Sequence, residues 1–242
     1  MKNQVIDLVT AAHSLPDEYQ KLTHLIYQLR DSNSIRTDLT LANDFIFTMG
    51  VIRGDATTEG AGGHAENAFL ALFYSAIVLY VRATKTQHDN RRSFDFVKDY
   101  DEEQRQKHRV LCDLRDHALS HYGTGGIYNG PAFQRDGVFV ASGPQGDGQI
   151  MTLSQRLVIQ PQLIADLGQM AHRALMLADK RTQILNQKVV DAIKEASSAS
   201  PDLLPVLREH STDLADFLGS DEAANTVLTG ARVGYKRGSM QH

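Results

Sequence analysis

The sequence predicts a mainly α-helical protein, a helical bundle with one small inserted β-hairpin. Long segments carry apolar residues at every third or fourth position, the period that gives a helix one core-facing side. Proline, glycine and short polar residues stand between these segments, where helices begin and end. One stretch, residues 136–160, instead has short apolar runs around a glycine-rich connection, which is typical of a hairpin.

The N-terminal part is expected to form three helices. Residues 5–12 are a short apolar-periodic segment, and a second helix begins near Pro16 and runs to about Arg30. The polar run at residues 31–34 predicts a turn. Residues 35–49 then predict a third helix, with apolar side chains at helical spacing.

The most hydrophobic helix is expected at about residues 65–87. It follows a glycine-rich loop, residues 54–63, which lacks the spacing of a phosphate-binding glycine motif. Residues 68–81 are apolar almost all round, as in the central buried helix of a bundle. This run is shorter than the roughly 20 residues that cross a membrane. A polar connection, residues 89–99, leads to the next helix.

That next helix, which carries the candidate site, is expected to start near Tyr100 or Asp101 and to end at Gly123. Arg115 lies four residues from two leucines and so falls inside the apolar arc of the helix. A charge at such a position must be paired or must face a cleft, because burying it alone costs several kcal/mol. The apolar stripe itself consists of Leu111, Leu114, Ala118 and Tyr122.

Arg115 and His121 flank this stripe from opposite sides. On an ideal helix their directions differ by about 120°, so they converge best on a group outside their own helix. Asp116 is the nearest polar neighbour of Arg115 in sequence. The pattern therefore indicates a partner helix or a ligand at this end of the helix.

Residues 115–121, RDHALSH, resemble the motif of HEPN domains, in which an arginine, a polar residue and a short spacer precede a histidine. The resemblance extends to the helix end LYVRAT at residues 79–84 and to His108-Arg109. The resemblance is to bacterial HEPN-like proteins and covers roughly residues 60–195. The implied fold is a HEPN-like helical bundle with the hairpin as an insert.

In that family the arginine and the histidine line a cleft, usually at a dimer interface. Active members cleave RNA without a metal, whereas others only bind nucleic acid. The resemblance thus implies a cytoplasmic homodimer acting on RNA, without cofactor or metal, of a toxin or defence type, with an antitoxin or other protein as a further partner. The alternative is a non-catalytic helical module that binds RNA or protein. The implied catalytic residues are Arg115, His121 and Asp116, and the implied substrate-binding residues are Arg82, His117 and Arg109.

Two other chemistries use residues of the same helix. Asp113, His117 and His121 recur every four residues and so share one face, as metal ligands can, but no second cluster completes such a site. His108 and Cys112 are also four apart, the spacing of a catalytic Cys–His pair, although a lone cysteine there is more often a packing residue.

A purely structural interpretation of the motif also stands. His121, close to the expected helix end, would interact favourably with the negative end of the helix dipole. Arg115 would then pair with a buried carboxylate of another helix.

The hairpin is expected from two apolar runs, residues 138–140 and 150–153, on either side of a glycine-rich connection. Residues 157–159 are a third candidate strand. Pro161 then opens a long helix that is expected to end at about residue 196.

The C-terminal part is expected as a separate region, residues 197–242, after a bundle comprising residues 1–196. A serine-rich break precedes two short helices at about residues 201–209 and 212–218. Residues 219–242 have little periodicity and predict an extended tail.

Composition sets the outer bounds on function. The chain has 242 residues and a formal charge of −4, which argues against a general grip on nucleic acid over a basic surface. Any RNA contact must therefore be a compact site. The single cysteine excludes an internal disulfide and suits the cytoplasm. The N-terminal residues lack the apolar core of a signal peptide, and no membrane partner is expected.

Overall fold

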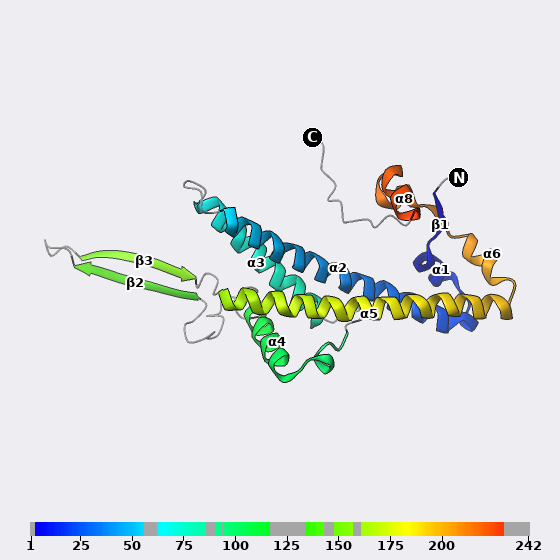
Figure 1. The fold of residues 1–242 in the computed structure, drawn as a ribbon, viewed down its shortest axis with the longest axis horizontal. Helices are drawn as coiled ribbons and strands as arrows, with labels where there is room; N and C mark the ends of the chain where they lie inside the picture. The colour runs from blue at the N-terminus through cyan, green and yellow to red at the C-terminus, as the bar shows by residue number, and fades with distance from the viewer. Residues whose placement is uncertain are drawn as a thin grey trace. The chain divides into compact units, whose positions relative to one another are not determined.

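The protein is mainly α-helical, as the sequence predicts (Figure 1). The computed structural model describes residues 3–55, 62–85, 91–92, 94–116, 134–142, 148–156 and 161–229. The helices are α1 (Leu8–Ser14), α2 (Gln20–Asp55), α3 (Gly62–Thr84), α4 (Glu102–Leu114), α5 (Pro161–Ala199), α6 (Leu203–Arg208), α7 (Leu214–Leu218) and α8 (Asp221–Leu228). The strands are β1 (Gln4–Ile6), β2 (Gln134–Ser142), β3 (Gly148–Arg156) and β4 (Ser211–Asp213).

The backbone contacts divide the chain into two compact units. The terminal unit contains described residues up to Arg30 and from Ile184 onward, and the central unit contains those from Asp31 to Gln183. Each unit has its own hydrophobic core. The expected division after residue 196 does not coincide with this one, because the two ends of the chain fold together.

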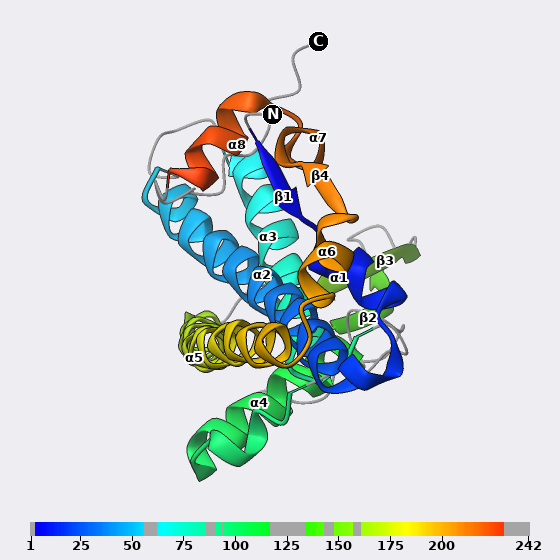
Figure 2. The ribbon, with the colours of Figure 1, turned by 90° about the vertical axis from the view of Figure 1, so that its right-hand side faces the viewer.

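In the terminal unit, the first described residues form a strand where the sequence predicts a helix over residues 5–12. β1 pairs antiparallel with β4, with Val5 opposite Thr212 (Figure 2). The helix begins only after Asp7, whose carboxylate accepts hydrogen bonds from the backbone N–H groups of Val9 and Thr10, at 2.9 and 3.1 Å. An N-cap of this kind fixes where α1 starts, and it leaves the preceding residues free to pair with β4.

The expected C-terminal tail is also wrong in its first part, since residues 221–228 form α8. Ser220 caps this helix by accepting a hydrogen bond from the N–H of Ala223, and Ala224 is fully buried. Asn3 donates a hydrogen bond to Asp221 at 2.9 Å and so links α8 to the N-terminal segment. The apolar residues at helical spacing, Ala224, Val227 and Leu228, span little more than one turn, which is a weak signal for a helix. Residues 230–242 lie outside the described part of the chain.

In the central unit, α2 passes without interruption through residues 31–34, where the sequence predicts a turn. Asp31 accepts a hydrogen bond from the backbone N–H of Arg92 at 3.1 Å. Ser32 is hydrogen-bonded to Thr182 of α5 at 2.7 Å. Polar side chains that find tertiary partners do not compete with the helix for its own backbone groups, so the helix continues.

The long helix from Pro161 is confirmed, and α5 continues past the expected break at residue 196 to Ala199. Within that extension, Ser198 donates its hydroxyl hydrogen bond to the carbonyl of Lys194, 2.9 Å away. The bond lies inside the helix, which is how a serine-rich segment remains helical here.

The core of the central unit gathers side chains from α2, α3, α4 and α5, together with the connection before α4. Phe94 and Phe96 anchor that connection, as expected, with ring centroids 5.6 Å apart. The largest fully buried side chains of this core are Tyr80, Tyr100, Phe73, Ile35, Leu39, Met49, Ile77, Leu111, Leu167 and Met170. Burial of such side chains is the main stabilising contribution to the fold.

α3 is buried along one side rather than all round. Phe73, Ile77 and Tyr80 are fully buried, while Val78 is 40% exposed. Over His64–Thr84 the helix is long and apolar enough to cross a membrane by length and composition alone, with 39% of the most apolar window buried inside the protein. The core helix of a soluble protein can pass the same test, so a single helix of this kind is weak evidence for a membrane span.

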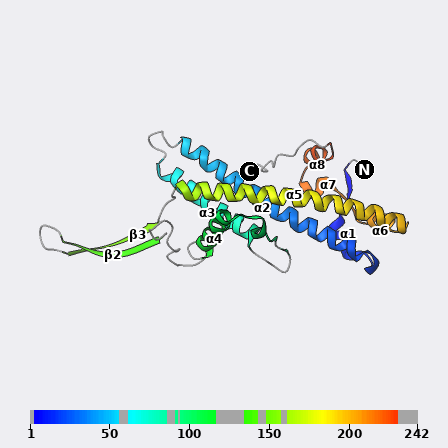
Figure 3. The same cartoon turned by 60° about the horizontal axis from the view of Figure 1, so that its bottom comes forward.

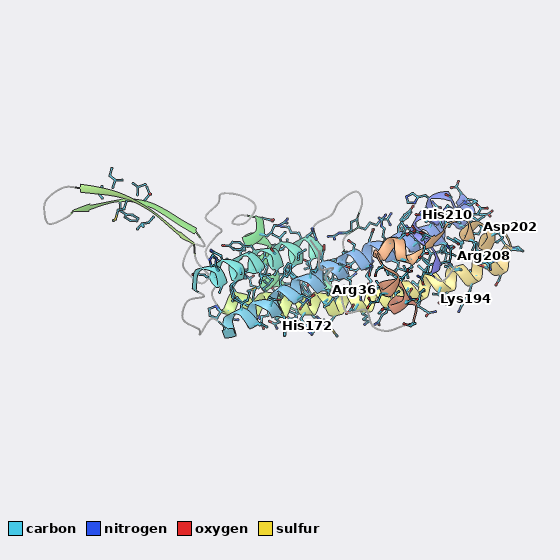
Figure 4. All side chains as sticks on the ribbon, turned by 90° about the horizontal axis from the view of Figure 1, so that it is seen from above. Arg36, His172, Lys194, Asp202, Arg208 and His210 are labelled. Atoms are coloured by element: carbon cyan, nitrogen blue, oxygen red, sulfur yellow. The ribbon has the colours of Figure 1, made fainter. Side chains whose placement is uncertain are left out.

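The β-hairpin is confirmed and is longer than the sequence predicts. β2 and β3 pair antiparallel over nine residues each, with Phe139 opposite Met151 and Val140 opposite Ile150 (Figure 3). Side chains project from both faces of this ribbon (Figure 4), and large apolar ones among them are well exposed. The candidate third strand, residues 157–159, lies outside the described residues.

Candidate functional site

The helix that carries the candidate motif begins where the sequence predicts. Asp101 is the N-cap of α4, and its carboxylate accepts a hydrogen bond from the backbone N–H of Gln104 at 2.8 Å. The Gln104 side chain reciprocally accepts one from the N–H of Asp101 at 3.3 Å. Glu102 and Glu103 in the first turn interact favourably with the positive end of the helix dipole.

At its other end, α4 leads directly into the motif. The helix proper ends at Leu114, and Arg115 and Asp116 continue in a π-helical turn. Leu111 and Leu114 are buried, as the apolar stripe predicts. His117 and His121 lie outside the described residues, as do Ala118, Tyr122 and Gly123.

Arg115 and Asp116 form a cluster of charges with Lys85, which follows the last turn of α3. The Nε of Arg115 lies 2.6 Å from Oδ1 of Asp116. Lys85 donates a hydrogen bond to the other oxygen, Oδ2, at 2.6 Å. One carboxylate is thus shared by two cations. The side chains of Arg115 and Asp116 are 23% and 31% exposed, so the cluster is accessible from solvent.

The Arg115 guanidinium is held by charge rather than by a well-directed hydrogen bond. Its Nε–H does not point at the nearby carboxylate oxygen, so this buried nitrogen has no hydrogen-bond acceptor in the described part of the chain. A guanidinium carries five N–H donors. The side chain as a whole is 23% exposed, so part of the guanidinium is accessible from solvent.

Lys85 is held firmly in its charged form. The hydrogen bond to Asp116 raises the pKa of the Lys85 ammonium above its usual value, and burial opposes this only in part. Lys85 and Arg115 are thus two cations on the one carboxylate of Asp116.

Arg82, one of the implied substrate-binding residues, contacts Asp38 on α2. Its Nε donates to Oδ2 of Asp38 at 2.9 Å, and Nη2 donates to the other oxygen of that carboxylate. Arg91 donates to Oδ2 of Asp38 as well, at 2.7 Å. The hydrogen bonds to Asp38 raise the pKa of Arg82. The side chain of Arg82 is nevertheless 51% exposed.

Arg109, the third implied arginine, is placed elsewhere on α4. It donates a hydrogen bond to Glu102 at 3.1 Å, and its side chain is largely exposed. On a helix, six residues separate Arg109 from Arg115 by about 9 Å along the axis and about 120° around it. The described structure therefore joins Arg115, Asp116 and Lys85, and leaves Arg109 outside this cluster.

Beneath the charged cluster lies a buried polar network. His108, 7% exposed, is hydrogen-bonded through Nδ1 to the hydroxyl of Tyr80 at 2.8 Å. The Sγ of Cys112 lies 3.5 Å from Nε2 of the same ring. The ring of Tyr100 packs edge-on against His108, with centroids 5.7 Å apart. Burial lowers the pKa of His108 and raises the pKa of Tyr100 to about 12.

The Cys–His pair is thus a buried packing contact. Burial raises the pKa of the Cys112 thiol to about 12, so the thiol is protonated at neutral pH. A nucleophilic cysteine requires the thiolate and some exposure. The arrangement argues against nucleophilic catalysis by Cys112.

The alternative metal site finds no support in the described residues, among which no group of three His, Cys, Asp or Glu side chains is placed to hold a metal ion. Asp113 is exposed on α4. The two histidines that would share the ion with it lie outside those residues.

Two hollows occur in the terminal unit, between the first turns of α2 and the last turns of α5. They have volumes of about 670 and 430 Å³ and share Lys21, Ala192 and Glu195 as lining residues. None of the residues implied by the motif lines them, so they do not form part of the candidate site.

Sequence reasoning missed Lys85, Asp38 and Arg91. The only local signal for Lys85 is its position three residues after Arg82, which places both on one side of the end of α3. Asp38 and Arg91 could not be paired from the sequence, because their partners are 44 and 53 residues away.

Comparison with protein-family models, with curated proteins and with solved structures found no significant match. The assignment of function therefore rests on the residues of the cluster and on the motif.

Proposed function

We propose that the protein is a HEPN-like RNA-binding protein that cleaves single-stranded RNA without a metal. The observation that carries the proposal is the cluster at the end of α4, where Arg115 and Lys85 share the single carboxylate of Asp116. Two cations on one carboxylate, with Arg115 partly exposed, suit a phosphate group. The compactness of the cluster also suits a chain with a net charge of −4.

The chemistry needs little from the protein, because RNA supplies its own nucleophile, the 2′-hydroxyl. Arg115 would bind the scissile phosphate and stabilise the negative charge that develops on it. Asp116 would hold Arg115 in place. His121 would transfer the proton, as general base or acid. The role of His121 rests on its spacing from Arg115 in the motif.

A homodimer is part of the same proposal. Arg115 and His121 flank the apolar stripe on opposite sides, so a complete site is most simply formed when two motifs face each other across a twofold axis. Light scattering at micromolar concentration should give twice the chain mass. A monomer that still cleaves RNA would refute the composite site. An antitoxin or other protein partner would act by covering this cleft.

The decisive experiment compares His121→Ala with His172→Ala. His172 is an exposed histidine on α5 (Figure 4), so its removal is a matched control. Wild-type protein should cleave single-stranded RNA in excess EDTA and leave 2′,3′-cyclic phosphate ends. His121→Ala should lose about 10²–10⁴-fold in rate while keeping its fold and its RNA affinity, and His172→Ala should remain active.

Each of the other outcomes would support a different function for the protein. RNA binding without cleavage would make the protein a non-catalytic helical binding module. Neither binding nor cleavage would leave the Arg115–Asp116 contact as a structural ion pair. Stoichiometric zinc in the purified protein, with a melting temperature that chelation lowers, would refute the metal-independent mechanism.

A further inference from the structure

Two cations stand at the end of α3: Arg82 in its last turn and Lys85 directly after it. Each of them contacts an aspartate that an arginine also contacts. Lys85 shares Asp116 with Arg115, as described above. Arg82 shares Asp38 with Arg91. The two clusters thus have the same composition, two cations on one carboxylate, and they are linked through neighbouring residues of one helix.

The residues of these two clusters carry a net charge opposite in sign to that of the whole chain. Four cations (Arg82, Lys85, Arg91 and Arg115) and two carboxylates (Asp38 and Asp116) give a net charge of +4 − 2 = +2, whereas the chain as a whole carries −4. A local excess of this sign attracts a polyanion. The negative end of the α3 dipole helps to hold the cations where they are.

Within the second cluster, Arg91 is the fixed member and Arg82 is the open one. Arg91 donates to Asp38, to Ser34 at 3.3 Å and to the carbonyl of Arg82 at 2.6 Å, and its side chain is only 17% exposed. Arg82 uses Nε and Nη2 on Asp38, and its side chain is 51% exposed. Asp38 and Arg91 therefore position Arg82 at the surface.

We propose that the end of α3 binds two consecutive phosphates of one RNA strand, the scissile one at Arg115 and Lys85 and its neighbour at Arg82. This proposal rests on the proposed function and extends it by a second phosphate subsite. Side chains three residues apart on a helix start about 5–6 Å from each other, and the length of arginine and lysine lets them reach adjacent phosphates. Asp38 and Arg91 are positioning residues of this second subsite.

The test measures binding of a single-stranded RNA oligonucleotide whose 2′-hydroxyls are methylated, so that it cannot be cleaved. Fluorescence anisotropy over a range of salt concentrations gives both the affinity and the number of phosphate contacts, since each contact contributes about 0.7 to the salt slope for a single strand. Arg82→Gln should weaken binding about five-fold and reduce the slope by about 0.7. Asp38 keeps Arg91 as a partner in this variant.

A second variant should act in the opposite direction. Ser34 is exposed on α2 beside Arg91, so Ser34→Lys adds a cation next to the second subsite. It removes the hydrogen bond from Arg91 to Ser34 but leaves the ion pairs of Arg91 and Arg82 with Asp38 in place. It should tighten binding about three-fold, with a steeper salt slope. The matched control is Arg36→Gln, because Arg36 pairs with Asp179 and lies about 200° around α2 from Asp38 (Figure 4). Its removal should leave both quantities unchanged.

The outcomes separate this proposal from the proposed function. If wild type binds the oligonucleotide and Arg82→Gln keeps the wild-type affinity and slope, the second subsite is refuted while the first stands. If Arg36→Gln weakens binding as much as Arg82→Gln, the effect is one of general charge and the subsite is refuted. If Ser34→Lys fails to tighten binding, no phosphate lies near the second subsite, and the subsite is refuted as well. If wild type does not bind, both proposals fail. Circular dichroism of every variant checks that the fold is kept.

Discussion

The buried network beneath the candidate site makes one sharp stability prediction, which uses two tyrosines that differ in a single respect. Tyr80 and Tyr100 are 0% and 1% exposed, and both rings contact His108. The Tyr80 hydroxyl is hydrogen-bonded to His108 Nδ1 at 2.8 Å. The Tyr100 hydroxyl is near that of Tyr80, but it has no hydrogen bond of good geometry in the described part of the chain.

The expected change in the free energy of unfolding depends on which polar atoms lose a partner when each hydroxyl is removed. Tyr80→Phe removes the hydroxyl bonded to His108 Nδ1 and leaves this nitrogen only the weak contact with Cys112 Sγ at 3.9 Å. A buried polar atom that loses its good partner costs about 1–3 kcal/mol. Because His108 is almost fully buried, we expect a loss of about 2 kcal/mol. Tyr100→Phe removes a hydroxyl that is already unpaired. Its stability should stay within about 0.5 kcal/mol of wild type or rise above it.

Urea unfolding followed by circular dichroism measures both variants at neutral pH. Hydrogen exchange of the amides of α3 and α4 gives the local free energy even if the two units unfold separately. A neutral Tyr80→Phe would refute the hydrogen bond as a stabilising contact. A Tyr100→Phe variant as costly as Tyr80→Phe would show that its hydroxyl is paired after all.

Three further predictions concern the same helix. Burial lowers the pKa of His108 below its unfolded value of 6.5, so the unfolded state binds the proton more readily and stability should fall as pH drops below about 6.5. Melting curves of His108→Gln at several pH values should lack this loss of stability. An unchanged pH dependence in that variant would contradict the prediction. Cys112, with its thiol pKa near 12, should react with a thiol reagent at least about 100-fold more slowly in the native than in the unfolded protein, and rapid labelling of native protein would show an open site. Asp101→Ala should cost about 1 kcal/mol through loss of the capping box, measurable by urea unfolding, whereas Asp101→Ser should restore most of it.

Local chemistry was enough to predict several elements from the sequence. Asp101 and Gln104 form a capping box within four residues, so the start of α4 could be read directly. The same holds for α5, whose first residue is Pro161, and for the hairpin, whose two apolar runs face each other across a short connection. In the candidate site, the sequence already named Asp116 as the nearest polar neighbour of Arg115, and the two are in contact. Each of these features depends on residues only a few positions apart, so the local pattern of apolar and polar residues is enough to predict it.

Tertiary structure decided the features whose partners are distant in sequence. Residues 31–34 have the composition of a turn, yet they stay helical because Ser32 and Asp31 find acceptors and donors on other segments. β1 is a strand because β4, more than two hundred residues later, offers it an edge. In the candidate site, the sequence shows only that a charged side chain on the apolar side of a helix needs a partner of opposite charge. Which carboxylate Lys85 or Arg82 reaches depends on how α2, α3 and α4 pack, and that packing is set by the apolar core as a whole rather than by any local pattern.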